Sequence, residues 1–491
     1  MDLTAVDLHA IAPEIALSVA LIAVLVIDLF LPDRFKSWNA VISMGGVIAS
    51  AIALATLVGE TRTTFASMFV VDSYSLLFKF LFLAVAGVLL LLSVTYLNES
   101  VRTIQGEFYF LLLTAILGAM VMPSARDMLA LFVALETVSI PGFLMAGFKK
   151  SDERGNEAAI KFFLFGVLSS AVMLFGMSLI FGVTGTTHLA GIAEALQNVE
   201  ASAAPLVVAS ILLIVVGFGF KVSAVPFHFW APDTYEGAPV PVAAFLSVAS
   251  KAAGFAGLLQ LTFFAFPNHA EVWAPGFGIM AALTMTLGNF VALQQTQIVR
   301  LLAYSSIGQA GYMLLPFAIV ANQGFDVTNE AFASALTYIL IYSFMNLGAF
   351  AVVIAVSRRM PNNQISDYEG LAVREPGLAM AMMFFMLSLA GMIPTAGFWA
   401  KFFVFRAAIG AGGAGSTILA SIMVINTVVG LYYYLGVAGK MYLREPRERS
   451  PLGVPYPIAV AIALLVLVVA IVTVYPEAFN HFSPRSTLVA L

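Results

Sequence analysis

The 491-residue sequence contains no cysteine. This absence excludes thiolate-ligated zinc, iron–sulfur clusters, disulfides and thiol nucleophiles, so any redox chemistry that the protein serves must take place elsewhere. Charged residues are also scarce, at 10% of the chain against 61% hydrophobic residues, and the mean hydropathy is +0.98. No stretch is polar enough to form a water-soluble domain, and no block of basic residues indicates nucleic acid.

Long apolar runs occupy most of the chain. A run of about 20 apolar residues spans a bilayer core as a helix, and we predict about fourteen such helices. They lie near residues 11–31, 39–59, 74–97, 107–123, 126–147, 157–184, 204–230, 239–266, 273–293, 299–321, 331–357, 376–409, 416–440 and 454–479. A short interfacial helix is expected within residues 186–205. The sequence therefore predicts an all-α polytopic membrane protein in contact with a lipid bilayer.

Basic residues outside these helices are distributed unevenly. Loops after even-numbered helices hold only Arg62 and Arg126. Loops after odd-numbered helices hold Arg34, Lys36, Arg102, Lys149, Lys150, Arg154, Arg300, Arg358, Arg359, Arg374, Lys440, Arg444, Arg447 and Arg449. Because short cytoplasmic loops are enriched in Lys and Arg, the pattern predicts both termini on the non-cytoplasmic side and an even number of helices.

Three lysines, Lys221, Lys251 and Lys401, lie inside or against predicted helices. A charge at the centre of a membrane helix costs roughly 2.5 to 3.5 kcal/mol and normally lines an ion path or pairs with a partner. Other basic residues have a simpler explanation: Lys79 and Arg406 lie near predicted helix ends, where a long side chain lets the charged group reach the interface. The three lysines therefore indicate function.

A proline interrupts the predicted helix that carries Lys221. Pro226 has no N–H to donate to the carbonyl of Val222 and clashes with it, so the helix must kink or unwind there. Broken helices within the membrane are typical of ion sites in secondary transporters. A proline alone often only bends a membrane helix, but the adjacent lysine favours the functional interpretation.

A similar pattern recurs five predicted helices later. Ile393-Pro394 and Phe398-Trp399-Ala400 match Val225-Pro226 and Phe229-Trp230-Ala231, and a weaker match aligns Ser305 with Glu136. Duplication of a five-helix unit reverses the second copy in the bilayer and gives an inverted repeat. We place three N-terminal helices at residues 1–103, the repeats at 104–268 and 269–445, and a C-terminal helix at 446–491.

These residues indicate a possible proton path. A nearby carboxylate stabilises a lysine ammonium in apolar surroundings, so opening of a pair between Glu136 and Lys221 would release a proton. Lys251 and His228 could then pass it toward Lys401. Two readings stay open: Glu136 forms such a pair, or it only neutralises a lysine that fixes helix packing.

Two further residues have alternative interpretations. Lys161 follows Glu157 by four residues, so it is either a surface ion pair or a member of the path. His228 is either a relay or a hydrogen-bonded residue of the helix break.

Residues 217–239 read GFGFKVSAVPFHFWAPDTYEGAP. Together with the motifs at residues 157–166, 247–255 and 303–308, this run resembles the antiporter-like membrane subunits of respiratory complex I, the proton-translocating NADH-quinone oxidoreductase. The resemblance covers essentially the whole chain.

The resemblance implies fourteen transmembrane helices with two inverted five-helix repeats, each with a broken helix. It also implies a proton path through Glu136, Lys221, Lys251 and Lys401. Lysine at position 401 is similar to the N-type branch of the family and unlike the M-type branch, and the end of the chain soon after the last helix implies that the lateral helix of the L-type branch is missing. Ser250 stands where relatives often have proline, which leaves the local helix geometry open.

The resemblance also implies the partners. Electrons would pass from NADH through FMN and Fe–S clusters in other subunits to a quinone. This chain would bind no redox cofactor and would translocate protons beside neighbouring antiporter-like subunits of complex I in a bacterial inner membrane. Two alternatives remain: a subunit of a cation/proton antiporter without redox partners, and a structural membrane subunit whose charges are locked in pairs.

Overall fold

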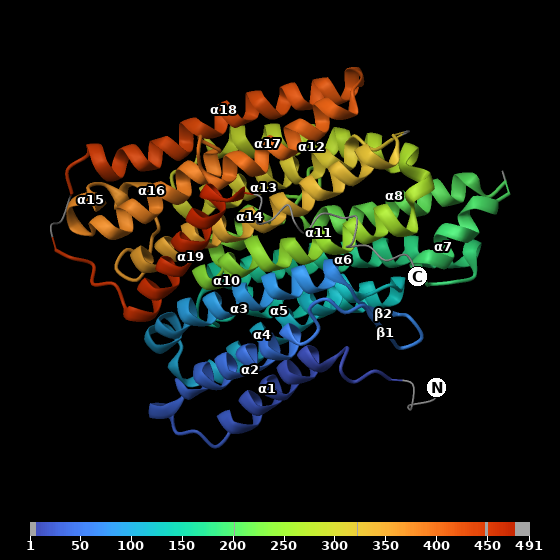
Figure 1. The fold of residues 1–491 in the computed structure, drawn as a ribbon. Coiled ribbons are helices and arrows are strands. Elements are labelled where there is room, and N and C mark those ends of the chain that lie inside the picture. Colours follow the sequence, from blue (N-terminus) through green and yellow to red (C-terminus); the bar gives the residue numbers. More distant parts are fainter. Residues whose placement is uncertain (1–5, 201, 322, 447–449, 477–491) are drawn as a thin grey trace.

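The protein is an elongated bundle of helices that lie side by side (Figure 1). The computed structural model describes residues 6–200, 202–321, 323–446 and 450–476. The first helices of the chain lie along one side of the bundle and α18 along the opposite side, with α7 and α15 at opposite ends. The end predicted for the last helix, and Arg447 and Arg449 of the charge pattern, lie outside the described residues.

The α-helices follow one another through the described chain. They are α1 (Ala12–Asp28), α2 (Trp38–Ala55), α3 (Ser73–Ser100), α4 (Gln105–Val121), α5 (Met128–Ala146), α6 (Glu153–Thr184), α7 (Leu189–Ala195), α8 (Ala204–Lys221), α9 (Trp230–Gly237), α10 (Val240–Phe245), α11 (Lys251–Gln260), α12 (Ala270–Ala292), α13 (Ile298–Ala318), α14 (Phe325–Ser357), α15 (Leu371–Arg374), α16 (Pro376–Ala390), α17 (Ala396–Ala411), α18 (Gly413–Leu443) and α19 (Tyr456–Val474).

Each of the fourteen predicted segments overlaps at least one of these helices. Within the described ranges, eleven helical stretches are long and apolar enough to cross a membrane. The other three predicted segments correspond to α1, which has 17 residues, to α13, and to the consecutive helices α16 and α17. The chain is therefore a multi-pass membrane protein, as its composition indicates.

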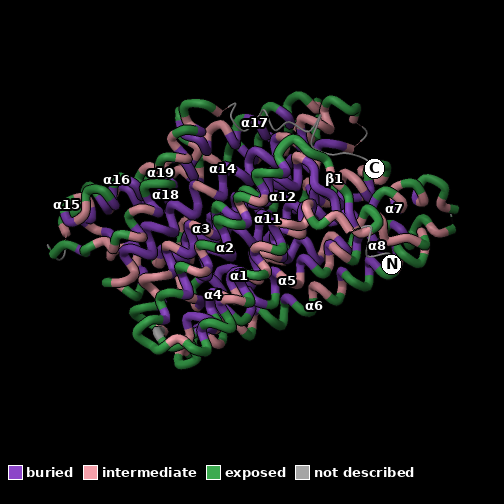
Figure 2. The backbone as a smooth tube through the Cα atoms, turned by 60° about the horizontal axis from the view of Figure 1, so that its bottom comes forward, coloured by how far each residue is buried: buried purple, intermediate pink, exposed green. Residues whose placement is uncertain are grey.

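The centre of the bundle is formed by two stretches that are buried almost throughout, Val240–Ala265 and α14. In the apolar stretches of α6 and α18, in contrast, only 28% and 22% of the residues are buried. Figure 2 shows the same division, with the buried backbone inside and exposed residues along the outer helices. Lys251 lies on one of the two central stretches, which explains why its side chain is buried.

Both proline-containing segments are interrupted rather than merely kinked. Helix α8 ends at Lys221 and α9 begins at Trp230, while α16 ends at Ala390 and α17 begins at Ala396. Val225-Pro226 and Ile393-Pro394 are cis peptide bonds. The predicted breaks are confirmed, and residues 222–229 lie between the two halves of the first broken helix.

Of two elements at one end of the bundle, one was predicted from the sequence and the other was not. The short helix expected within residues 186–205 is confirmed as α7 (Figure 1). The antiparallel strands β1 (Arg62–Thr64) and β2 (Phe69–Val71) were not expected, because three residues are too few to produce a recognisable alternation. Phe69 also forms an isolated bridge with Ala125, which ties the hairpin to the loop before α5.

The interpretation of Lys79 as an interfacial residue was wrong. Its side chain is fully buried, and its ammonium lies 2.8 Å from the Glu14 carboxylate of α1 and 4.5 Å from the centre of the Phe69 ring. Helix α1 and the β-hairpin cover this part of α3, so the ammonium finds a carboxylate instead of water. Arg406, in contrast, is more than half exposed and pairs with Glu330 at 2.7 Å.

Candidate functional site

Lys221, the last residue of α8, is held against two other helices. Its side chain is buried, with 4% of the residue exposed. Its ammonium donates to the Ser139 hydroxyl of α5 at 2.9 Å, and that hydroxyl in turn donates to the Leu135 carbonyl at 2.7 Å. On the other side lies Gly254 of α11, where an added Cβ would come within 2.8 Å of the Lys221 Cγ atom. Gly254 therefore allows α11 to pass close to the lysine.

Glu136 lies one helical turn before Ser139 on α5 and is partly buried. Its Oε1 atom accepts a hydrogen bond of 2.5 Å from the Ser170 hydroxyl of α6. No ion pair within 4.0 Å joins Glu136 to Lys221, although the structure describes both residues. The carboxylate and the lysine predicted to pair thus lie on different helices, α5 and α8, and bind two different serines.

Lys251 begins α11 and is 2% exposed. Its ammonium donates to both the carbonyl and the hydroxyl of Ser306 on α13, at 2.9 Å each. A π-helical turn, Leu246–Ser250, immediately precedes the lysine. Serine at position 250 therefore continues a widened helix without interruption, and π-helical turns of this kind occur frequently at functional sites.

Lys401 of α17 folds back across the second helix break and is 6% exposed. Its ammonium donates to the carbonyls of Ala390 at 2.9 Å and Leu389 at 3.2 Å, and it lies 4.9 Å from the centre of the Tyr312 ring. The last carbonyls of a helix have no partner within the helix and carry partial negative charge. Gly391, at φ +82°, leaves room for the lysine, since an added Cβ would lie 2.8 Å from the Lys401 Cδ atom.

A line of buried polar groups runs from the Lys251 region toward Lys401. Ser305, next to the serine that binds Lys251, shares a 2.5 Å hydrogen bond with the Tyr434 hydroxyl of α18. Gln309 donates to that hydroxyl at 3.1 Å and to the Leu389 carbonyl at 3.0 Å. Because the same carbonyl accepts from Lys401, the hydrogen bonds continue from Ser305 to the Lys401 ammonium.

The sequence analysis missed Gln309 and Tyr434. They lie on α13 and α18, and no motif joins those helices in the sequence. Their only signal was that polar side chains recur within apolar segments. The Tyr338 hydroxyl, which donates to the Gln309 Oε1 atom at 2.5 Å, was missed for the same reason.

Two buried tyrosines face the Lys251 anchor. The hydroxyls of Tyr235 and Tyr342 lie near the Ser306 side chain, and neither has a hydrogen-bond partner among the described residues. Buried polar groups of this kind are where ordered water binds in proteins. The surroundings of Lys251 therefore contain more than one buried hydroxyl group.

His228 and Lys161 lie away from these contacts. His228 sits in the break between α8 and α9, half-buried, and its buried Nδ1 atom has no hydrogen-bond partner. Lys161 is 41% exposed and pairs with Glu157 at 2.8 Å, as expected for residues four apart, and with Asp233 at 3.0 Å. Asp233 also pairs with Arg300 at 3.0 Å, so Lys161 belongs to an ion network that joins α6, α9 and α13.

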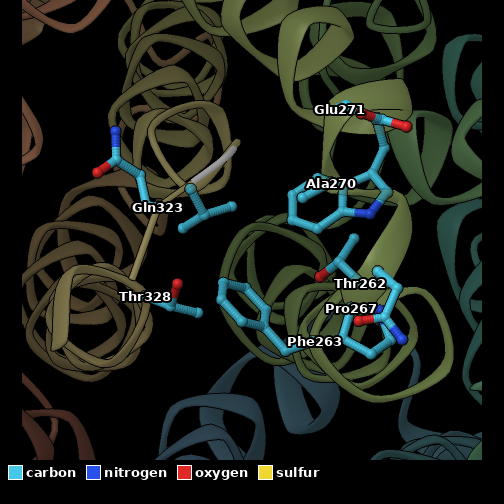
Figure 3. Close-up of a pocket in the computed structure, with 10 residues that line it drawn as sticks. Thr262, Phe263, Pro267, Ala270, Glu271, Gln323 and Thr328 are labelled. Atoms are coloured by element: carbon cyan, nitrogen blue, oxygen red, sulfur yellow. The ribbon is translucent and has the colours of Figure 1, made fainter. Parts of the chain in front are cut away.

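A separate polar pocket lies where the Lys251-bearing stretch ends (Figure 3). Glu271, Gln323, Thr262 and Thr328 contribute to its lining. Phe263 also lines it and packs edge-on against the buried rings of Phe317 and Phe332. The core side of this pocket is thus apolar, and none of the three buried lysines reaches it. Among the described residues, no group of three or more His, Asp or Glu could hold a metal ion.

Comparison with known proteins identifies the origin of this arrangement. A family model described as NADH:quinone oxidoreductase/Mrp antiporter, TM matches residues 125–430, which include Glu136 and all three buried lysines. The chain belongs to this family. The resemblance recognised in the sequence is therefore confirmed.

Relatives match over nearly the full length. NADH-quinone oxidoreductase subunit N of Trichlorobacter lovleyi is 40% identical over 483 residues, covering 98% of this chain and 97% of the relative. Subunit N 2 of Streptomyces griseus is 42% identical, covering 92% and 84%. NAD(P)H-quinone oxidoreductase subunit 2 of Thermosynechococcus vestitus is 43% identical, covering 91% and 84%.

Solved structures agree. A chain of respiratory complex I from Thermus thermophilus, solved with bound aureothin, superposes with a TM-score of 0.78 at 31% identity, covering 96% of this chain and 99% of that one. A chain of the Mrp complex from Dietzia sp. reaches a TM-score of 0.83 at 20% identity, covering 98% and 96%. At that identity the second match shows the shared fold alone.

Proposed function

We propose that this chain is a membrane-arm subunit of NADH-quinone oxidoreductase that translocates protons, coupled to electron transfer from NADH to quinone. One observation carries the proposal: Lys221, Lys251 and Lys401 are buried in a subunit N relative, and all three ammonium groups donate only to neutral oxygens. Lys79 differs from them, because its buried ammonium forms an ion pair with the Glu14 carboxylate. None of the three lysines forms an ion pair with a carboxylate among the described residues. A proton path requires groups that can change partner.

The proposed path uses Glu136, Lys221, Lys251 and Lys401 in that order. Protons move between them when a side chain changes partner, and the Ser305–Tyr434 hydrogen bond supplies exchangeable hydroxyls in the second half of the path. His228 is a candidate relay at the first helix break. Lys161 remains a candidate at the surface, where its ion network meets α9.

The remaining assignments belong to the same proposal. FMN, Fe–S clusters and quinone are bound by partner subunits, and this chain lies beside other antiporter-like subunits in a bacterial inner membrane. Both termini are on the non-cytoplasmic side, which the uneven distribution of basic residues supports. Residues 104–268 and 269–445 form two inverted repeats, which the two interrupted helices support.

Assembly is tested by native electrophoresis of mildly solubilised membranes. The chain is detected by antibody, and the same lane is stained for NADH dehydrogenase activity and examined for flavin. Comigration at high mass is expected. Migration in a flavin-free assembly would contradict the redox role and favour cation/proton antiport.

Transport is tested with Lys221→Ala in the whole complex reconstituted into liposomes. We expect the complex to assemble while proton pumping falls sharply relative to NADH oxidation. Lys150→Ala, in an exposed loop, is the matched control. Normal pumping by an assembled Lys221→Ala complex would contradict a path through this lysine, whereas failure of Lys221→Ala alone to assemble would favour the structural alternative.

A further inference from the structure

The Ser170 hydroxyl differs from most other Ser and Thr hydroxyls in the membrane helices. Many Ser and Thr side chains here donate back to a carbonyl three or four residues earlier, as is usual in helices. They include Thr114, Thr137, Ser139, Ser178, Thr184, Ser210, Thr262, Ser343, Thr427 and Thr473. Ser170 instead donates to the Glu136 carboxylate at 2.5 Å. This hydrogen bond therefore joins α6 to α5 through the Glu136 side chain.

Ser139 occupies the place that a carboxylate would take beside Lys221. Its own proton is committed to the Leu135 carbonyl at 2.7 Å, so it can only accept from the lysine, at 2.9 Å. Residues three apart on a helix share a face. Glu136 therefore projects from α5 one turn from Ser139, which accepts from the Lys221 ammonium, while its carboxylate is bound to a different helix.

We propose that Ser170 is a positioning residue that holds the Glu136 carboxylate on α6, in one of two alternative positions, and that the other position is beside Lys221 and Ser139. The inference rests on the proposed function, because it assigns to Ser170 the control of one contact in the proton path. The structure records the position in which the carboxylate and the lysine are apart. Rotation of the Glu136 side chain exchanges the Ser170 hydrogen bond for an ion pair with Lys221.

Removing the Ser170 hydroxyl destabilises the position of the Glu136 carboxylate at α6 and leaves the position beside Lys221 available. A hydrogen bond to a charged group contributes enough free energy to change a two-position equilibrium by about tenfold or more. In Ser170→Ala, the carboxylate therefore moves toward Lys221 and the pair stays closed. Ser170→Thr keeps a hydroxyl at this place and is expected to restore both positions.

Whole complex carrying each variant is purified, reconstituted into liposomes and measured in two ways. Infrared difference spectroscopy reports the Glu136 carboxyl and carboxylate bands, which are identified by their loss in Glu136→Gln. Proton pumping is compared with NADH oxidation in the same preparation. Ser178→Ala is the matched control, because Ser178 lies on α6, is exposed and donates only to the Phe175 carbonyl.

We expect Ser170→Ala to shift the Glu136 bands and to lower pumping relative to NADH oxidation, Ser170→Thr to restore both, and Ser178→Ala to change neither. Should Ser170→Ala fail to assemble, Ser170→Cys, whose thiol is a weak donor, takes its place. Unchanged Glu136 bands would overturn the inference, as would shifted bands with normal pumping. If Glu136→Gln itself pumps normally, the proposed path through Glu136 is wrong, while the band shift still decides whether Ser170 binds this carboxylate.

Discussion

The ammonium of Lys401 donates a 2.9 Å hydrogen bond to the carbonyl of Ala390, the last residue of α16. A side chain of the second half of a broken helix thereby satisfies the backbone of the first half. The first break uses the same principle with a different residue, since the Trp230 indole donates to the Phe220 carbonyl at 3.0 Å. In the second break, the group that stabilises the fold is also the proposed proton carrier.

Replacement of Lys401 should affect transport more than assembly, although its ammonium also binds the end of α16. In Lys401→Ala we expect the complex to form, because Gln309 still donates to the Leu389 carbonyl, and the ratio of protons pumped to NADH oxidised to fall severalfold. The ratio is measured in liposomes, with Lys150→Ala as control. An unchanged ratio would remove Lys401 from the path.

Tyr434 should matter more than its neighbour Tyr433. Tyr434→Phe deletes the hydroxyl that joins Ser305 to Gln309, so we expect pumping to decrease while NADH oxidation by the assembled complex continues. Tyr433→Phe also removes a buried hydroxyl, one that donates to Asn289 at 3.0 Å outside this connection. Each change costs about 1 to 2 kcal/mol of stability. Equal pumping by the two variants would show that the Ser305–Tyr434 link carries no protons.

The buried ion pair between Arg126 and Asp72 should be a strong contributor to stability. The guanidinium lies 2.5 Å from the carboxylate and also donates to Gln260, so it joins the start of α3, the loop before α5 and the end of α11. Arg126→Ala leaves a buried carboxylate without its partner, which costs about 3 to 5 kcal/mol. Retention of assembled complex after mild heating measures this loss. Arg62→Ala, which removes partly exposed ion pairs with Asp7 and Glu60, should behave like the unmodified chain.

Gly397 should tolerate no side chain. An added Cβ would lie 1.7 Å from the Ser388 carbonyl oxygen, so α17 could not approach α16 across the break. We expect Gly397→Ala to lower the amount of assembled complex, since overpacking against backbone costs about 1 to 3 kcal/mol or more. At Gly182 of α6 nothing lies within 4 Å of an added Cβ, and Gly182→Ala should be neutral or slightly stabilising. Similar assembly of the two variants would contradict the close approach at Gly397.

Properties that depend on neighbours along the chain could be predicted. Apolar runs of membrane-spanning length are a local signal, so each predicted segment contains a helix. A proline inside such a run removes a backbone hydrogen bond wherever the helix packs, so the interruptions near Pro226 and Pro394 could also be foreseen. The same reasoning identified Lys221, Lys251 and Lys401 as residues that need an explanation.

Properties that depend on which helices face each other could not be predicted from the sequence. From the sequence, Lys79 was expected to reach the interface and Lys221 to need a partner within the membrane, but packing places a carboxylate against Lys79 and a serine against Lys221. In the sequence, Ser170 is not distinguished from other helical serines. Its bond to Glu136 exists only because α5 packs beside α6. The sequence by itself determined where charges enter the membrane; the tertiary structure decided which of them are paired, because a hydrogen bond between helices requires both rotation and depth to match.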